Sequence, residues 1–376
     1  MDFHYYLPTN LLFGRGKFAC IGKESIKYGK KALIVTGGSS TKKSGLLDKT
    51  ISLLKMEGIN SCVFDQVKPN PLTTTVYEGA KMALLNNCDM IIGLGGGSSL
   101  DAAKGIAFQA VNGGDISTYI FGEKSSDKAL PLILVPTTCG TGSEGNGFAV
   151  LSNPDTNDKK SLRCNAIIAK CSIIDPELMM TMPREVLASV GFDALSHNME
   201  AYISNMAQPF TRIHALEGIR LLGENLIKVY QNPTALEGWD EITFASTLGG
   251  MVINHAGVTA PHGMEHPASG LKDITHGRGL AALIPTVFEE SIDAAPDKFA
   301  TISKLLGGRD EFDLVDRIRY ILSKLNLSSS LSADGITEED IDWMAKNCLK
   351  VSTASLLNHP KQFGLDDLKR IYRKSL

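Results

Sequence analysis

The sequence predicts two successive domains, an α/β domain built on a parallel sheet and an all-helical domain. In the first half, short runs of apolar, β-branched residues alternate with stretches whose apolar residues recur at helical spacing. In the second half the strand signals end and the helical periodicity continues. A length of 376 residues also exceeds what one compact core usually holds. We therefore expect one domain over residues 1–181 and another over residues 182–376.

The first domain is expected to alternate strands and helices along the chain. Strands are predicted at residues 31–36, 61–64, 89–94 and 129–135, where short apolar runs are bounded by turn residues. Helices are predicted between them, at residues 49–57, 73–86 and 100–109. Near-continuous apolar strands are typical of a parallel sheet that helices cover on both faces.

The second domain is predicted to consist of helices alone. Residues 184–204, 211–230, 240–255, 277–293 and 311–325 all carry apolar residues at helical spacing. Residues 175–183 begin with Asp-Pro and end with proline, which is typical of a connecting hinge. A cleft between the two domains is the expected ligand site.

Composition excludes several classes of protein. The formal net charge is −3 and the Lys and Arg residues are spread along the chain, so no surface for nucleic acid is predicted. The apolar runs are shorter than the ~20 residues that span a bilayer, and the N-terminus does not read as a signal peptide. Seven cysteines without tight pairing indicate reduced thiols. We expect a cytoplasmic protein without a membrane or nucleic-acid partner.

A glycine-rich turn follows the third predicted strand. Gly95, Gly96 and Gly97 lead through Ser98 and Ser99 into a predicted helix. Glycine lets the backbone approach a phosphate, and a helix N-terminus offers free N–H groups to it. The sequence matches neither G-x-G-x-x-G nor the P-loop pattern, and a plain tight turn is the alternative. The strand, three glycines, paired serines and helix together favour dinucleotide binding.

Two further turns bear on the cofactor. The loop PTTCGTGSE at residues 136–144 follows the last predicted strand, and its hydroxyls and glycines suit ribose, pyrophosphate or nicotinamide contacts. The turn at residues 36–43 carries hydroxyls, Lys42 and Lys43 but no acid. Because NAD-selective sites usually place a carboxylate near the ribose 2′-OH, this turn predicts NADP in preference to NAD.

One aspartate and several histidines indicate a metal site in the helical domain. Asp193 and His197 are four residues apart, which places both side chains on one helix face. His262 and His266 repeat that spacing, and His276 follows after a loop. One carboxylate with imidazoles is a ligand field suited to Fe(II) or Zn(II). The spacing does not decide whether His262 or His266 is the ligand.

Together these motifs resemble the iron-containing alcohol dehydrogenase family, which shares its fold with dehydroquinate synthase and glycerol dehydrogenase. The similarity covers nearly the whole chain, including residues 95–104 (GGGSSLDAAK), 136–144, 191–202 (GFDALSHNMEAY) and 262–277. It implies a dehydroquinate synthase-like fold, in which the α/β domain binds the dinucleotide and the helical domain binds the metal. The turn at residues 37–40 (GGSS) resembles that of NADP-using members.

The resemblance also implies roles for individual residues. The metal ligands are expected to be Asp193, His197, His262 and His276. His266 is expected to be the catalytic residue beside the nicotinamide and substrate, and a nearby lysine, Lys159 or alternatively Lys160, to contact the cofactor. The full set of expected cofactor contacts is Gly38, Ser39, Ser40, Asn70, Gly96, Gly97, Ser98, Ser99, Asp101, Thr137, Thr138, Thr141, Asn146 and Lys159.

The expected activity is hydride transfer between NAD(P) and a short-chain primary alcohol or diol, or its aldehyde, with Fe(II) or alternatively Zn(II). Phe148 and Leu162 are the candidate apolar residues of the substrate pocket. The alternatives are a dehydroquinate synthase-like lyase, a glycerol dehydrogenase-like enzyme and a non-catalytic dinucleotide sensor. The lyase needs several Lys and Arg for its anionic substrate, whereas the segments AYISNM and GVTAPHGM near the expected metal hold none. The family also implies a homo-oligomer, a dimer or larger.

Overall fold

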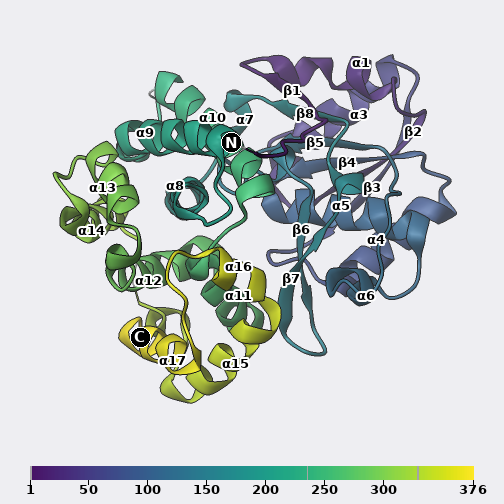
Figure 1. The fold of residues 1–376 in the computed structure, drawn as a ribbon. Helices are drawn as coiled ribbons and strands as arrows, with labels where there is room; N and C mark the ends of the chain where they lie inside the picture. The colour runs from purple at the N-terminus through teal and green to yellow at the C-terminus, as the bar shows by residue number, and fades with distance from the viewer. Residues whose placement is uncertain (1, 235, 328–329) are drawn as a thin grey trace.

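A parallel sheet and a group of helices form the two parts of the chain in a computed structural model, which describes residues 2–234, 236–327 and 330–376 (Figure 1). Six strands of the described residues pair in the order β1-β8-β5-β4-β2-β3, and every pairing is parallel. Their bounds are β1 Asn10–Phe13, β2 Lys31–Gly37, β3 Asn60–Val67, β4 Met90–Gly95, β5 Leu132–Pro136 and β8 Cys171–Ile174.

Helices cover both faces of this sheet, which explains why its central strands are apolar throughout. On β2, Leu33 and Val35 face α4 and α5, whereas Ile34 faces α1 and α3, and all three are fully buried. The helices of this domain are α1 Ile21–Ser25, α2 Ser40–Lys43, α3 Leu46–Met56, α4 Thr73–Leu85, α5 Gly97–Asn112 and α6 Ile116–Ile120. The four predicted strands and the helices between them are confirmed as β2 to β5 and α3 to α5.

The strand order reverses beside β2. From β2 the chain continues to β3 on one side, and it then crosses to β4 on the other side. In open parallel sheets a ligand binds at such a point, outside the carboxyl ends of the strands. The turns that leave β2 and β4 at this place are the two glycine-containing turns, at residues 37–40 and 95–97.

An antiparallel hairpin, which the sequence did not predict, joins the two domains. Its strands β6 (Phe148–Asn153) and β7 (Asp158–Arg163) pair with each other apart from the main sheet. The hairpin packs on α5 of its own domain and reaches α11 and α15 of the helical domain (Figure 1). It thereby forms a wall between the domains.

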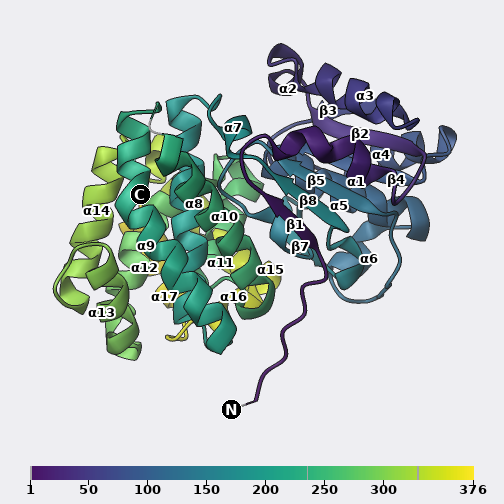
Figure 2. The same cartoon turned by 90° about the horizontal axis from the view of Figure 1, so that it is seen from above.

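Every regular element that the structure describes after β8 is helical, as predicted. These helices are α7 Pro176–Met179, α8 Arg184–Ile203, α9 Pro209–Gln231, α10 Leu236–Ala256, α11 Ala260–Lys272, α12 His276–Glu289, α13 Pro296–Leu305, α14 Leu314–Lys324, α15 Ile341–Val351, α16 Thr353–Asn358 and α17 Leu365–Lys374. The predicted helices correspond to α8, α9, α10, α12 and α14. Figure 2 shows α8 to α10 beside the β1 edge of the sheet, where the rings of Phe13 and Phe244 meet.

The two domains also touch backbone to backbone. A Cβ on Gly250 of α10 would lie 1.9 Å from the carbonyl oxygen of Gly142, in the loop after β5. Glycine at both positions therefore allows the loop and the helix to approach each other closely. The predicted boundary between residues 181 and 182 falls in the segment between α7 and α8. All seven cysteines are free, and no described helix is long and apolar enough to cross a membrane.

Candidate active site and metal centre

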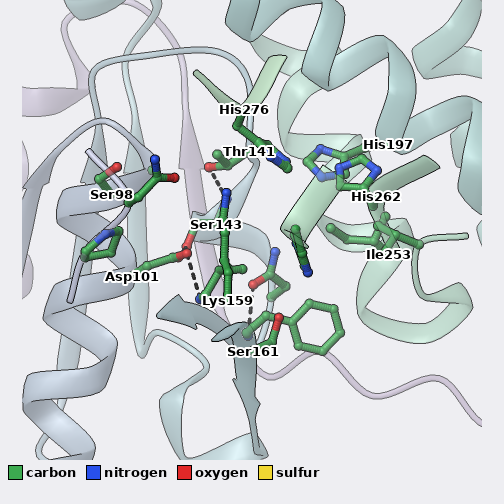
Figure 3. A pocket seen from close by; sticks show the side chains of 18 of the residues that line it. Ser98, Asp101, Thr141, Ser143, Lys159, Ser161, His197, Ile253, His262 and His276 are labelled. Atoms are coloured by element: carbon green, nitrogen blue, oxygen red, sulfur yellow. Dashed lines mark hydrogen bonds between the residues drawn. The ribbon is translucent and has the colours of Figure 1, made fainter. Parts of the chain in front are cut away.

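A cavity lies between the two domains. The glycine-rich turn, the loop after β5 and the hairpin line it from one domain, and α8, α10, α11 and α12 line it from the other. Figure 3 shows Ser98 and Asp101 on one side of the cavity and His197 and His262 on the opposite side. The cavity therefore joins the expected cofactor side to the expected metal side.

Four side chains from three helices meet at the helical side of the cavity. Asp193 and His197 come from one face of α8, His262 from α11, and His276 is the first residue of α12. Asp193 Oδ1 lies 3.5 Å from His262 Nε2 and 3.7 Å from the Nε2 atoms of both His197 and His276. Ligands at about 2.1 Å from a tetrahedral ion are separated by about 3.4 Å. The ligand atoms of Asp193, His262 and His276 all lie within 4.8 Å of one another, which fits a shared metal ion, and His197 adds a fourth candidate beside Asp193.

The electrostatics of this group also fit a cation. Asp193 Oδ1 and His262 Nε2 are buried and have no hydrogen-bond partner among the described residues, which is costly unless an ion satisfies them. Burial opposes charge on His262, yet Glu200 and Asp193 raise its pKa to about 10. Burial likewise opposes charge on Asp193, yet His197 and the other imidazoles hold its pKa well below its usual value. The group thus combines a negative potential with atoms that are free to bind a metal ion.

Two buried glutamates orient the imidazoles from behind. His262 Nδ1 donates to Glu200 Oε1 at 2.5 Å, and His276 Nδ1 lies 2.5 Å from Glu265 Oε2. A carboxylate at Nδ1 leaves Nε2 free to bind a metal. The sequence reasoning missed both glutamates. Glu200 follows Asp193 by seven residues on the same face of α8, a spacing that could have revealed it.

His266 lies beside this group and outside it. It stands one turn after His262 on α11, lines the cavity, and its ring centroid is 6.0 Å from that of His276. Burial, followed by the positive charge of Lys159, places the pKa of His266 well below its usual value. The structure therefore places His262 in the metal group and His266 outside it, a distinction that sequence spacing alone did not make.

The glycine-rich turn brings a helix N-terminus to the other side of the cavity. Helix α5 begins at Gly97, which lines the cavity together with Ser98. A Cβ on Gly97 would lie 2.4 Å from Thr141 Cγ2, and one on Gly95, whose φ is +147°, would lie 2.7 Å from Ser99 Oγ. The absence of side chains thus allows the two loops to pack closely and exposes a positive helix end that suits a phosphate.

The residues predicted to contact the cofactor fall into three groups. Asn70, Gly97, Ser98, Asp101, Thr141, Asn146 and Lys159 line the main cavity. Ser40 and Thr137 line a second hollow. Gly38, Ser39, Gly96, Ser99 and Thr138 lie in the same turns, and among the described residues they line neither space.

Some of these residues also brace the site internally. Asp101 accepts hydrogen bonds from Ser143 Oγ at 2.6 Å and from the Val150 amide at 2.9 Å. Lys104, which the sequence reasoning did not select, is fully buried and donates to Asn146 Oδ1 and to Ser143. These contacts fasten the loop after β5 to α5 and to the hairpin.

Asn70 ties the first domain to the second. Its backbone has a φ of +50°, and its Nδ2 donates to Asp273 Oδ1 at 2.7 Å, between α11 and α12. Asn70 also lines the cavity, so this contact with the segment before His276 joins the cofactor side to the metal side.

The strands of the hairpin determine whether the predicted residues Lys159, Phe148 and Leu162 face the cavity. Lys159 points into the cavity, with its Nζ 3.4 Å from Glu265 Oε2, whereas Lys160 donates to the carbonyl oxygen of Val351. Phe148 lines the cavity as predicted. Leu162 does not: successive side chains of a strand alternate between faces, so Leu162 is buried in the core of the first domain.

An acid that is distant in sequence lies beside the first turn. Asp65, at the end of β3, forms an ion pair with Lys42, and Lys42 in turn lowers the pKa of Asp65. The turn at residues 36–43 therefore has an acid beside it that lies 23 residues away in sequence. This carboxylate weakens the charge argument for a 2′-phosphate.

Comparison with known proteins agrees with this geometry. A family model described as iron-containing alcohol dehydrogenase matches residues 8–176, and the model of that family's C-terminal domain matches residues 187–376. The chain belongs to the iron-containing alcohol dehydrogenase family. Membership in this alcohol dehydrogenase family implies an iron-type metal and NAD(H), and it does not support the lyase alternative.

Individual alcohol dehydrogenases are similar over their full length. The 1,3-propanediol dehydrogenase of Klebsiella pneumoniae is 34% identical over 99% of this chain and 98% of its own. NADH-dependent butanol dehydrogenase B of Clostridium acetobutylicum is 32% identical over 100% of both chains. The crystal structure of an archaeal halo-thermophilic alcohol dehydrogenase from a Red Sea brine pool superimposes with a TM-score of 0.96, at 32% identity, over 100% of this chain and 99% of that one.

Proposed function

We propose that this alcohol dehydrogenase interconverts a short-chain primary alcohol or diol and its aldehyde, with NAD(H) as the hydride carrier. The observation that carries the proposal is that the three histidines of the donor group line the same cavity as the N-terminus of α5. Asp193, His197, His262 and His276 would hold Fe(II), with Zn(II) as the alternative. Relatives named for 1,3-propanediol and butanol support the substrate class.

The reaction needs one hydride and one proton. In reduction, a nicotinamide bound in the cavity would supply the hydride for the aldehyde carbon, and a proton for the carbonyl oxygen would complete the alcohol and leave the oxidised cofactor. The metal, when bound, supplies the Lewis acidity that polarises that oxygen. Gly97 and Ser98 would hold the phosphates of the dinucleotide, and the apolar wall around Phe148 would limit the access of water.

We assign proton exchange with solvent to His266. Its imidazole lines the cavity next to the metal group without belonging to it. The expected result of His266→Ala is a slower reaction with an altered pH profile, while the metal content stays the same. An unchanged rate and pH profile would show that His266 carries no proton.

The choice between NAD(H) and NADP(H) stays a prediction. The hydroxyl-rich turn with Lys42 favours NADP(H), whereas the pairing of Lys42 with Asp65 and the NAD(H)-linked names of the relatives favour NAD(H). We propose NAD(H) as a functional cofactor and treat a preference for NADP(H) as a question of relative KM.

The proposal is tested by initial rates on a panel of C2–C6 alcohols, diols and aldehydes with each dinucleotide. The enzyme is stripped of metal and assayed before and after Fe(II) or Zn(II) is added back. The expected result is metal-dependent turnover of several short substrates. A protein that binds the dinucleotide but turns over none of them would refute the proposal in favour of a sensor.

A further inference from the structure

The hairpin presents a row of polar side chains to the cavity. Lys159, Ser161 and Arg163 alternate along β7, so all three lie on the face that lines the cavity. Opposite them on β6, Val150 pairs with Ser161 and Phe148 pairs with Arg163. The row places two cations in the cavity, although the segments AYISNM and GVTAPHGM near the metal group contain no Lys or Arg.

The two cations of this row differ in their partners. Lys159 is buried and forms an ion pair with Glu265. The Arg163 side chain remains exposed within the cavity, and its guanidinium carbon lies 4.6 Å above the centroid of the Phe148 ring. Across the described residues, no hydrogen bond or ion pair satisfies the Arg163 guanidinium. The surrounding protein lowers the pKa of Arg163 by desolvation although part of the side chain still reaches solvent, and no carboxylate raises that pKa.

Two buried carboxylates on or beside the hairpin are already engaged. Asp158 accepts from Asn347 at 2.8 Å and from Lys350 at 2.7 Å, and Asp101 is held by Ser143 and a backbone amide. Neither is free to turn toward Arg163. Lys160 lies on the other face of β7, and its pKa is lowered first by burial and then by the positive charge of Arg163, so it does not neutralise the guanidinium. The arginine therefore offers an unused planar set of donors to an anion.

The position of Arg163 indicates which molecule carries that anion. Lys159 marks the metal end of the row through Glu265, which contacts His276. Arg163 is four residues further along the strand, about 13 Å away at ~3.3 Å per residue. Phe148, beside it, packs on the apolar cluster that includes Ile253 and Val258 on the helical side of the cavity. The cavity thus runs from the metal group along an apolar wall to a cation.

We propose that Arg163 binds an oxyanion at the end of the substrate opposite to the reacting carbon. The preferred substrates are then ω-oxo or ω-hydroxy acids, in which a short alkyl chain separates the aldehyde or alcohol from a carboxylate or a similar oxyanion. This inference rests on the proposed function, because it uses the metal group to define the reacting end. The bidentate fork of arginine fits a carboxylate geometrically and holds it with charge-assisted hydrogen bonds.

The test compares a charged and an uncharged aldehyde of equal length. The kcat/KM for 4-oxobutanoate and for butanal is measured with wild-type enzyme, Arg163→Met, Arg163→Lys and the exposed-surface control Arg319→Gln. We expect Arg163→Met to lower the ratio of the two values by about 10- to 100-fold, which is the effect of losing hydrogen bonds to a charged group. Arg163→Lys, which keeps the charge and loses the fork, should lower it less, and Arg319→Gln should leave it unchanged.

Three outcomes are distinguishable. A series of ω-oxo acids with three to six carbons should show a maximum in the wild-type enzyme and none in Arg163→Met. A ratio that Arg163→Met leaves unchanged, while butanal is still reduced, overturns this inference and leaves the proposed function intact. A raised KM for NADH or NADPH with an unchanged ratio assigns Arg163 to the cofactor and also overturns it. Failure of every enzyme form with both aldehydes refutes the proposed function itself.

Discussion

Replacement of Glu200 by glutamine tests whether a buried carboxylate behind a histidine controls the metal site. Glu200 accepts from His262 Nδ1 at 2.5 Å, from the Thr259 amide at 2.6 Å and from Thr259 Oγ1 at 3.0 Å. In Glu200→Gln, one of the two oxygens becomes an NH₂ donor, so either His262 or Thr259 faces a donor in place of an acceptor. The His262 imidazole also loses the negative charge of the neighbouring carboxylate, which makes it a stronger metal ligand. We expect metal affinity to fall about 10- to 100-fold.

The assay is competition for Zn(II) between the enzyme and a chromophoric chelator. Glu144→Gln is the matched control, since Glu144 is also buried and accepts from Thr247 Oγ1 at 2.8 Å, away from the metal group. Both substitutions are expected to cost about 1–3 kcal/mol of unfolding free energy, so metal affinity is the property that separates them. Equal metal affinity in wild type and Glu200→Gln would refute the orienting role.

Three further predictions concern other parts of the molecule. Gly97→Ala should raise the KM for the dinucleotide about tenfold, because the added methyl group would lie 2.4 Å from Thr141 Cγ2; an unchanged KM would contradict the close packing of the two loops. Asp65→Asn should lower the KM for NADP(H) relative to NAD(H), since it frees Lys42, and kinetics with both cofactors measure this ratio. Two cations lower the pKa of Glu290 from 4.5 to about 2, so its stabilisation is present above about pH 4.5 and is lost as the pH falls toward 2. The urea unfolding of Glu290→Gln should therefore differ from wild type by about 1–2 kcal/mol at pH 7, after allowance for solvent screening, and by less at pH 3; a pH-independent difference would argue against this linkage.

The parts of the fold that follow from local pattern were predictable. The strands β2, β4 and β5 are short apolar runs because helices cover both of their faces. Each is followed by a glycine-containing turn, and this combination indicates a parallel sheet. The hairpin was not predictable in the same way. Strand β7 reads DKKSLR, and Lys159 and Arg163 face a cavity that only the second domain closes. Because polar side chains of this strand face a cavity and not an apolar core, the strand resembles a polar loop in sequence.

The residues of the candidate site also divide into those that local spacing reveals and those that only packing brings together. Asp193 and His197 were found because their spacing on one helix is local. Glu265 was not found because its contact with His276 depends on how α11 packs against α12. Lys159 and Arg163 were not recognised as cations of the cavity for a similar reason, since they arrive from the hairpin of the other domain. Contacts between distant segments are fixed by packing, which periodicity does not report.

The central claim is that one metal ion held by Asp193 and three histidines is required for hydride transfer. The most direct measurement is the rate of aldehyde reduction by metal-stripped enzyme as Fe(II) or Zn(II) is titrated in, with NADH binding followed by its fluorescence in the same samples. The account predicts that NADH binds throughout, that turnover is absent without metal, and that it reaches a plateau at one ion per chain in wild type and is abolished in Asp193→Asn. Full turnover by the stripped enzyme, or by Asp193→Asn, would contradict it.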